Sequence, residues 1–476
     1  MRWARRHCAG RYRGGNRTAV SVDPEHDAVS ASLDWVEHSV APQQFIATKF
    51  NNNDPTQGIE MQRPKKEGGT MRRSTDQILT THAGSLPRPE RLRAAWSKPT
   101  RSGAEEAELQ ALLRSSISEV LATQLIAGID IPNDGEFGKP MRSASDLAAW
   151  GTYIFNRISG FGPTSPDVAA PDRALPGEPM RIVGMRWEQR EFSEFYAESG
   201  LGIPTTASRP TCTGPITYTG NDALRRDLAN LKAATDAKGV EEAFVTSIAP
   251  GSLETFCRGQ NSYYPTAEGF LEAIATALNV EYRAIAEAGF TLQLDDPGLP
   301  DTWDMLEPQP SIEQYKRYAM LRIEALNHAL EGIPEDRVRY HICWGSWHGP
   351  HTTDIPLRDI INVILRVKAQ AYSVEAANVR HEHEYKIWQE VKLPAGKILI
   401  PGVVSHATNV VEHPELVADR ILAYAKAVGR DNVIAGTDCG LGGRVHSQIA
   451  WAKLRVLVEG ARLATSKLLG KLTAAC

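Results

Sequence analysis

The sequence predicts an α/β protein built as one closed (β/α)8 TIM barrel, and two observations carry this prediction. From residue 76 to residue 470, short β-type runs alternate with amphipathic helical segments. Such alternation is typical of a parallel sheet whose strands are joined by crossover helices. No glycine-rich phosphate loop follows the first predicted strand, which favours a closed barrel over an open sheet.

The spacing of apolar residues predicts the individual helices and strands. Apolar residues recur at spacings of three and four where helices are expected, and each later helix is followed by a short apolar run that suits a buried strand. Pro414 fits the first turn of its helix. Helices are expected within 104–130, 268–290, 311–330, 358–370, 413–429 and 447–469, and strands within 291–297, 338–345, 371–377, 397–404 and 432–440.

Residues 1–75 differ from the rest of the chain. The first 22 residues contain six arginines and no acidic residue, and the segment that follows is polar and rich in turn formers. Such a segment cannot bury enough apolar surface to offset its ordering entropy. We expect a disordered extension, which is either an organellar targeting segment or the product of a mis-assigned start, with Met71 as the true first residue.

Composition limits the function. The formal net charge is −4 with both signs mixed along the chain, so nucleic acid is not an expected partner. No apolar run approaches the roughly 18 residues of a membrane span. The cysteines are sparse and irregular, which indicates a reducing, cytoplasmic compartment and leaves metal binding or thiol chemistry open. They are Cys8, Cys212, Cys257, Cys343, Cys439 and Cys476.

Polar residues gather at the ends of the predicted strands, where the active sites of such barrels lie. His341 and Cys343 are two residues apart in "RYHICWGSWHGPH", so their side chains share one face of a strand. A nitrogen and a sulfur on one face form half of a zinc site. Taken alone, this pair also suits a buried cysteine that behaves as a small apolar residue beside a core histidine.

Seven segments, in order, resemble the catalytic barrel of cobalamin-independent methionine synthase and its single-barrel relatives that alkylate thiols, such as epoxyalkane:coenzyme M transferase. The similarity covers residues 76–470. The methionine synthases carry a second, N-terminal barrel, for which residues 1–75 are too short, so a folate donor is left open. The segments are "THAGSLPRP", "GIDIPNDGEFGK", "SRPTCTGPITY", "LQLDDP", "HIC", "SVEAAN" and "TDCGL".

The resemblance implies a Zn²⁺ ion held by His341, Cys343, Glu375 and Cys439. The chemistry is consistent, because free thiols ionise near pH 8.5 whereas a thiol on zinc is deprotonated outright. For the carboxylate ligand, "SVEAANVRHEHEY" offers other side chains besides Glu375, and a solvated charged turn would equally explain them. These are His381, Glu382, His383 and Glu384.

The resemblance also implies a binding site for an amino-acid thiol, made by Ser85, Glu136 and Asp295. The neighbouring Asp296 stands where the family has a glutamate. His406 is the candidate general acid, because an imidazole can protonate a poor amine leaving group. The nearby His348 and His351 are either pocket residues or ordinary loop residues.

The expected activity is zinc-dependent transfer of a methyl or other alkyl group to a thiol. Homocysteine is the expected acceptor and methyltetrahydrofolate, or a related carrier, the expected donor. The alternatives are epoxide transfer to a small thiol such as coenzyme M or glutathione, and a catalytically inactive zinc-binding barrel. The partners are therefore small molecules, and the sequence leaves the oligomeric state open.

Overall fold

The computed structural model describes two separate units of the chain, Met1–Thr70 and Met71–Cys476. The described residues are 45–50, 59–65, 71–143, 149–163, 174–199 and 210–470. In the first unit, β1 (Phe45–Phe50) and β2 (Ile59–Lys65) pair in antiparallel fashion. The sequence predicted no strands there. The rest of the expected extension lies outside the described residues, apart from Met71 and its neighbours, which belong to the second unit.

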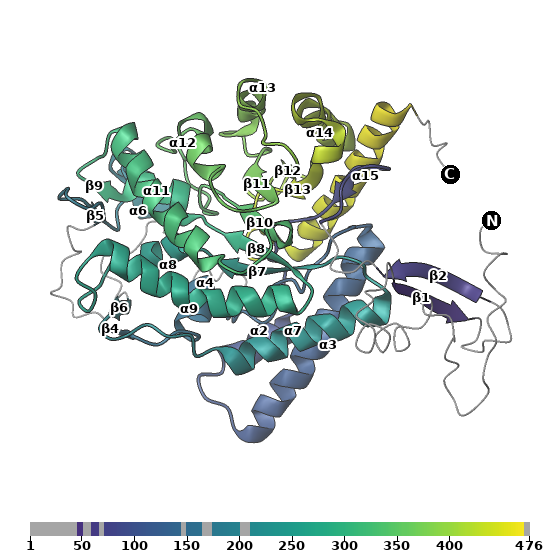
Figure 1. The fold of residues 1–476 in the computed structure, drawn as a ribbon, viewed down its shortest axis with the longest axis horizontal. Coiled ribbons are helices and arrows are strands. Elements are labelled where there is room, and N and C mark those ends of the chain that lie inside the picture. The colour runs from purple at the N-terminus through teal and green to yellow at the C-terminus, as the bar shows by residue number, and fades with distance from the viewer. Residues whose placement is uncertain are drawn as a thin grey trace, which may run out of the picture. The chain divides into compact units, whose positions relative to one another are not determined.

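The second unit is built around a parallel sheet that curls into a barrel (Figure 1). Seven strands follow the order β3-β13-β12-β11-β10-β8-β7, and every neighbouring pair is parallel. The predicted alternation of strands and crossover helices is thereby confirmed. The strands are β3 (Leu79–Thr80), β7 (Phe244–Ile248), β8 (Thr291–Asp295), β10 (Val338–His341), β11 (Ala371–Glu375), β12 (Ile398–Val404) and β13 (Ile434–Thr437).

A short segment, residues 130–133, occupies the eighth position between the two edge strands, and its Asn133 forms a parallel bridge with Phe244. The backbone N–H groups of Asp130 and Ile131 donate to the Thr80 carbonyl of β3, at 3.2 and 3.0 Å. On the other side, Phe244 of β7 donates to the Pro132 carbonyl at 3.1 Å. These bonds close the ring, so the predicted (β/α)8 barrel is confirmed.

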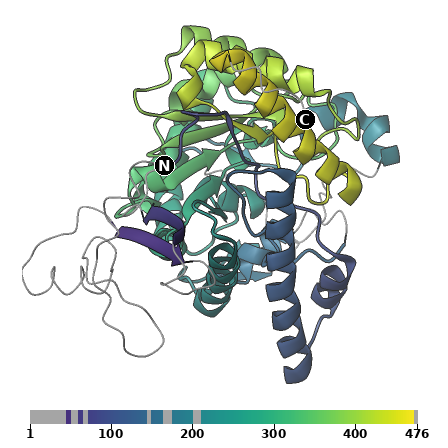
Figure 2. The same cartoon turned by 90° about the vertical axis from the view of Figure 1, so that its right-hand side faces the viewer.

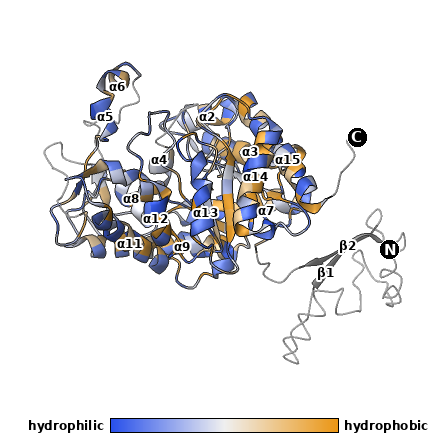
Figure 3. Ribbon diagram, turned by 90° about the horizontal axis from the view of Figure 1, so that it is seen from above, coloured by the Kyte–Doolittle hydropathy of each residue, from blue (hydrophilic) through white to orange (hydrophobic). Residues whose placement is uncertain are grey.

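Helices surround the barrel, and they show apolar and polar faces in Figure 3. α3 starts at a capping box, in which Ser102 and Glu105 satisfy each other's backbone N–H groups. The last long helix, α15, packs beside both α14 and α3 and so joins the two ends of the ring (Figure 2). The main helices around the barrel are α3 (Gly103–Ala127), α7 (Asn221–Lys238), α9 (Ala267–Glu287), α11 (Ile312–Ala329), α12 (Leu357–Ile364), α14 (Pro414–Val428) and α15 (Ser447–Leu469).

Shorter elements fill the connections around the barrel. α8 follows β7 directly, and Pro250 occupies its first turn. None of the helices in the described ranges is long and apolar enough to cross a bilayer. The short elements are α2 (Glu90–Ser97), α4 (Ala149–Phe155), α5 (Glu188–Glu191), α6 (Ser193–Ser199), α8 (Pro250–Phe256), α10 (Gly298–Asp301), α13 (Ile387–Glu390), β4 (Phe161–Pro163), β5 (Arg181–Ile182), β6 (Pro210–Cys212) and β9 (Leu306–Glu307).

The interior of the barrel is filled in layers. A buried apolar cluster that includes Leu79, Ile131 and Phe244 draws on strands all around the ring. Arg339 of β10 lies over the Phe244 ring at 4.0 Å and donates to Thr81 and to the His82 carbonyl. Because alternate residues of a strand face the same way, the next side chain of β10 on this side is that of His341. The interior layers therefore support the strand end where His341 lies.

Candidate metal centre

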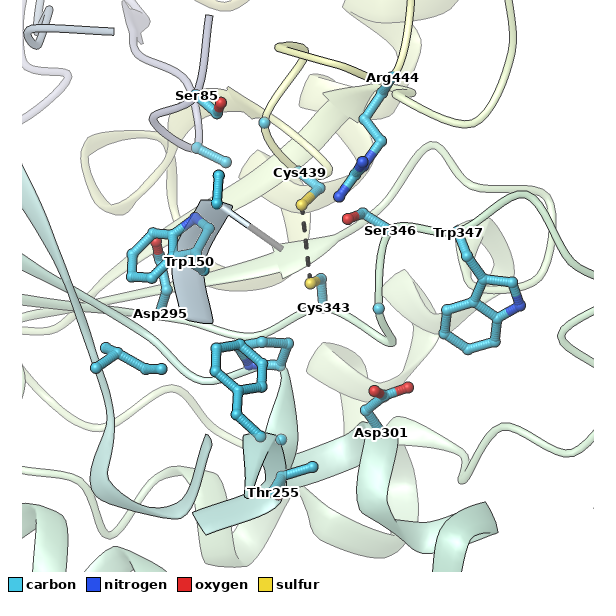
Figure 4. A pocket seen from close by; sticks show the side chains of 18 of the residues that line it. Ser85, Trp150, Thr255, Asp295, Asp301, Cys343, Ser346, Trp347, Cys439 and Arg444 are labelled. Atoms are coloured by element: carbon cyan, nitrogen blue, oxygen red, sulfur yellow. Dashed lines mark hydrogen bonds between the residues drawn. The ribbon is translucent and has the colours of Figure 1, made fainter. Parts of the chain in front are cut away.

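Two cysteines and one histidine meet at the carboxyl ends of β10 and β13. One ligand atom from each of His341, Cys343 and Cys439 lies within 4.8 Å of the others. The two sulfur atoms are 3.8 Å apart and face each other in Figure 4. His341 ends β10, Cys343 follows two residues later, and Cys439 follows the end of β13 by two residues. The structure thus brings together three of the four side chains predicted to bind zinc.

The surroundings of His341 orient its ring towards the sulfurs. The ring is buried, and its Nδ1 atom pairs with the hydroxyl of Ser373 on β11 at 3.0 Å. The Nε2 atom has no hydrogen-bond partner among the described residues. Both cysteines are free thiols. The hydrogen bond to Nδ1 orients the ring and leaves Nε2 available as a metal ligand. Together with two thiols at this separation, this nitrogen fits the donor set of a zinc site.

The two sulfurs form a coupled pair. They share one hydrogen bond, which lowers the pKa of the Cys439 thiol and, together with burial, raises the pKa of the Cys343 thiol. Cys439 is therefore the first of the two to ionise. A cation bound between the two sulfurs would stabilise both of them as thiolates.

Glu375 ends β11, as the sequence predicted, and is buried. Its carboxylate accepts a hydrogen bond from the Trp344 backbone N–H at 3.1 Å and another from the Asn378 amide at 2.9 Å. It does not belong to the group of atoms that lie within 4.8 Å of one another in the described part of the chain. Its role as fourth ligand stays a prediction.

Two of the other candidates near Glu375, His381 and Glu384, belong to a different network. His381 pairs through Nε2 with Asp354 and through Nδ1 with Glu384, each at 3.0 Å. Its ring stacks on the Trp344 ring at a centroid distance of 3.8 Å. His351 also contacts Asp354, at 3.0 Å. These contacts anchor the loop after β10, so they give a structural role to side chains that the sequence left ambiguous.

A cavity of about 320 Å³ opens over the three metal-ligand candidates. All three side chains line it, as do Ser85, Glu136 and Asp295, the residues predicted to bind an amino-acid thiol. Aromatic walls come from Trp150 and Trp347. The cavity is also lined by Arg88, Arg186, Arg258 and Arg444. The structure therefore unites the predicted metal ligands and the predicted substrate residues, except Glu375, around one space.

Two carboxylates supply negative charge to the cavity. Glu136 has a positive φ of 62° and accepts a hydrogen bond from Thr246 at 2.8 Å, which fixes its direction. Asp295 ends β8 and accepts from Gln293 at 2.6 Å. Burial raises the pKa of Asp295 to about 7, against the opposing effect of His341. Asp296 does not share this environment, because Ser252 and Tyr340 donate to its carboxylate.

Ser85 is held at the cavity wall by contacts that the sequence did not reveal. Its carbonyl accepts from the N–H groups of Leu441 and Gly442, which follow Cys439 closely in the chain. The guanidinium of Arg88 donates to the Ser85 hydroxyl at 3.2 Å and to the Glu136 carbonyl at 2.6 Å. Arg88 thus ties two predicted substrate residues together. It lies inside the motif "THAGSLPRP", which was its only signal.

His406 follows β12 by two residues and is buried. Its Nδ1 atom has no hydrogen-bond partner among the described residues, and burial lowers the pKa of the ring. It is not one of the side chains that line the described cavity. A role as general acid stays a prediction. His348 is likewise not among the lining residues.

The chain matches one protein family over much of its length. Residues 205–463, more than half of the chain, match the family described as "Cobalamin-independent synthase, Catalytic domain". The chain therefore belongs to this family, and the family predicted from the sequence motifs is confirmed.

Individual relatives are distant but nearly complete in coverage. The methionine synthase of Sulfurisphaera tokodaii is 23% identical over 398 residues, which cover 83% of this chain and 94% of the relative. The 2-hydroxypropyl-CoM lyase of Xanthobacter autotrophicus is 22% identical, with coverages of 82% and 96%. A B12-independent methionine synthase from Shewanella sp. W3-18-1, in complex with selenomethionine, superposes with a TM-score of 0.59 at 20% identity, over 83% of this chain and 100% of that one. This likeness supports the fold.

Proposed function

We propose that the protein transfers a methyl or other alkyl group to the sulfur of homocysteine in a zinc-dependent reaction, with methyltetrahydrofolate or a related methyl carrier as donor. One observation carries the proposal: the histidine and two cysteines lie in the same cavity as two carboxylates, Glu136 and Asp295. An amino-acid thiol such as homocysteine fits this arrangement, because its sulfur would lie near the histidine and the cysteines and its ammonium group near the carboxylates.

Zinc held by His341, Cys343 and Cys439, with Glu375 as the proposed fourth ligand, would keep the acceptor as a thiolate at neutral pH. Ser373 would keep the imidazole directed at the ion, because it holds the opposite ring nitrogen. The cysteinates and the carboxylate would leave the acceptor sulfur electron-rich. The protein residues thus prepare the nucleophile before the donor arrives.

Orientation of the acceptor would come from the cavity wall. Glu136 and Asp295 would bind the ammonium group, while Ser85 would donate to the carboxylate. Arg88 fixes the relative position of Ser85 and Glu136, so it acts as a positioning residue. The thiolate sulfur then attacks the alkyl carbon in line, the carbon–sulfur bond forms, and the donor departs with the electron pair of the broken bond. His406 is the residue we propose to protonate an amine leaving group.

A second candidate is the opening of an epoxide by a small thiol. It is supported by the relative named 2-hydroxypropyl-CoM lyase, which matches this chain over 82% of its length. The reaction would use the same three metal ligands. It would not need an ammonium-binding pair, so the two carboxylates in the cavity favour the amino-acid acceptor.

The test compares two assays on purified, zinc-loaded protein. One contains homocysteine and methyltetrahydrofolate, and the other contains an epoxide with coenzyme M or glutathione. Methionine formation that is lost in Cys439→Ser supports the proposal, whereas thioether formation only in the second assay supports the epoxide reaction. Tight zinc binding without either product would identify an inactive zinc-binding barrel.

A further inference from the structure

Arg444 carries a positive charge into the cavity beside the sulfur pair. It lies five residues after Cys439, in the turn that leads to α15, and its side chain is half-buried. Figure 4 shows its guanidinium directed at the space between Cys439 and Ser346. Nothing in the sequence singled out this residue, because one arginine in a glycine-rich turn has no distinctive pattern.

The environment of Arg444 differs from that of other arginines in the same cavity. Arg186 is held by Asp301 at 2.6 Å and by Asp304 at 2.9 Å, and Arg88 is held by Ser85 and the Glu136 carbonyl. The guanidinium of Arg444, in contrast, makes no hydrogen bond or ion pair with any residue that the structure describes. The groups whose negative charge acts on it are Cys439, Cys343 and Glu136. A guanidinium partly withdrawn from water is costly unless an anion accompanies it. A ligand can supply that anion.

The position of Arg444 indicates which ligand supplies the anion. In Figure 4, Ser85, Trp150 and Asp295 lie on one side of the sulfur pair, and Arg444 lies with Ser346 and Trp347 on the other. The first side carries the groups that the proposed function assigns to the amino-acid acceptor. The second side is therefore left for the alkyl donor.

Trp347 lines the same cavity as Arg444, and its ring is held by close contacts. The Trp347 ring is sandwiched by the Arg186 guanidinium at 3.6 Å and by the His351 ring at a centroid distance of 3.9 Å. Its indole N–H donates to the Tyr196 hydroxyl at 3.3 Å. An aromatic ring and a guanidinium in one cavity suit an organic molecule that carries an oxyanion.

We infer that Arg444 determines donor specificity: it binds a carboxylate, phosphate or sulfonate group of the alkyl donor, which is therefore an organic anion. This inference rests on the proposed alkyl transfer to homocysteine. The alternative that the experiment separates from this one is that Arg444 only offsets the negative charge of the two thiolates. That role would affect metal binding and would act equally on anionic and neutral donors.

Iodoacetate and iodoacetamide form a matched pair of probes, since they differ chiefly in charge. In both reactions the homocysteine thiolate attacks the CH₂ carbon, a carbon–sulfur bond forms, and iodide leaves with the electron pair of the carbon–iodine bond. Mass spectrometry measures the homocysteine thioether that zinc-loaded protein releases. The rate ratio of the two reagents with free homocysteine in buffer provides the reference.

The wild-type protein should prefer iodoacetate by about tenfold over the buffer ratio, as expected for one charge-assisted hydrogen bond. Arg444→Met should return the ratio to the buffer value, and Arg444→Lys should keep part of the preference. Arg455→Met is the control, because it removes the same charge from an exposed position on α15. Zinc content and thermal midpoint should be unchanged in all three variants.

The possible outcomes are distinct. If the protein accelerates both reagents but the ratio equals the buffer ratio, or is the same in Arg444→Met, this inference is overturned while the proposed function stands. A variant that loses zinc and slows both reagents equally also overturns it, in favour of charge compensation. If the wild-type protein accelerates neither reagent, this inference is overturned, whereas the methionine assay decides the proposed function.

Discussion

The sulfur atoms of Cys343 and Cys439 are separated by 96 residues of sequence and lie 3.8 Å apart. One follows β10 and the other follows β13, and the parallel order of the barrel brings both strand ends to the same rim. The His341 ring completes the group from the same face of β10. A barrel therefore assembles from distant segments what a short sequence motif could only suggest.

Replacing either cysteine by serine should abolish tight zinc binding. We expect Cys343→Ser and Cys439→Ser each to lower zinc affinity by more than about a hundredfold, the upper range for loss of a partner that only supports a ligand. Competition with a chromogenic chelator measures the affinity. Cys212→Ser is the control, because its sulfur donates to the Gly214 carbonyl and a hydroxyl can do the same. Unchanged affinity in both site variants would show that the sulfurs do not bind metal.

Removing the Ser373 hydroxyl should weaken zinc binding without removing a ligand. Ser373→Ala leaves Nδ1 of His341 without its partner at 3.0 Å, so we expect a loss of about 10- to 100-fold in zinc affinity. Ser116→Ala is the matched control, since the Ser116 hydroxyl is buried and has no partner among the described residues. Equal affinities in the two variants would argue against a supporting role for Ser373.

Glu375→Gln tests the fourth ligand. The amide oxygen can still accept from the Trp344 N–H, but the negative charge is lost. We expect at least a tenfold loss of zinc affinity and a changed visible spectrum of the cobalt-substituted protein. Glu384→Gln is the control, because Glu384 is also buried and accepts from the Leu357 N–H at 2.7 Å. Loss of zinc in Glu384→Gln alone would transfer the role away from Glu375.

The sequence predicted a closed barrel, because strands and helices alternate clearly along the chain, but it did not predict which segment closes the ring. The eighth position, residues 130–133, follows α3 closely and contains Pro132, so it carries no strand pattern of its own. The helix expected over 358–370 ends at Ile364. Beyond it the chain turns, and the Gln370 N–H bonds to the Val338 carbonyl of β10. Tertiary contacts determine both which segment closes the ring and where this helix ends.

The sequence predicted some residues of the candidate site and missed others. His341, Cys343 and Cys439 carry their chemistry in the residue type, so a motif was sufficient to find them. Arg88 and Arg444 could not be found in this way, because arginines are common and only the folded loops show which of them enter the cavity.

Glu254 and Arg322 form a buried ion pair, and we expect it to stabilise the barrel because each side chain neutralises the buried charge of the other. Arg322 donates through Nε and Nη2 to the carboxylate at 2.9 and 2.8 Å, and both side chains are at most 3% exposed. Arg322→Met should lower the free energy of unfolding by about 3–5 kcal/mol, because it leaves a buried carboxylate without a partner. Denaturant titration measures the loss.

Two comparisons test the cause of that loss. Arg91 and Glu119 form an exposed pair at 2.7 Å, so Arg91→Met should cost less than about 1 kcal/mol. The double variant Glu254→Met with Arg322→Met should recover much of the lost stability, since neither charge remains. A double variant as unstable as Arg322→Met would contradict the explanation by charge.

Glu281 should make the stability depend on pH. Burial raises the pKa of its carboxyl to about 8, although Lys139 opposes the shift. The ordinary value in an unfolded chain is about 4.3. The folded state therefore holds an extra proton between these values, so the stabilisation is complete below about pH 4.3 and is lost as pH rises through about 8.

Glu281→Gln removes this dependence, because an amide imitates the protonated acid at every pH and can still accept from the Ser247 hydroxyl, now 2.7 Å from the carboxylate. From pH 5 to pH 9, the unfolding free energy of the wild type should fall relative to that of the variant by roughly 2–4 kcal/mol. Denaturant titrations at both pH values measure the difference. Glu119→Gln, at an exposed position, should show no such change. Parallel pH profiles for Glu281→Gln and the wild type would mean that Glu281 is ionised in the folded protein, and that its contacts with Tyr153 and Arg157 stabilise the carboxylate rather than the acid.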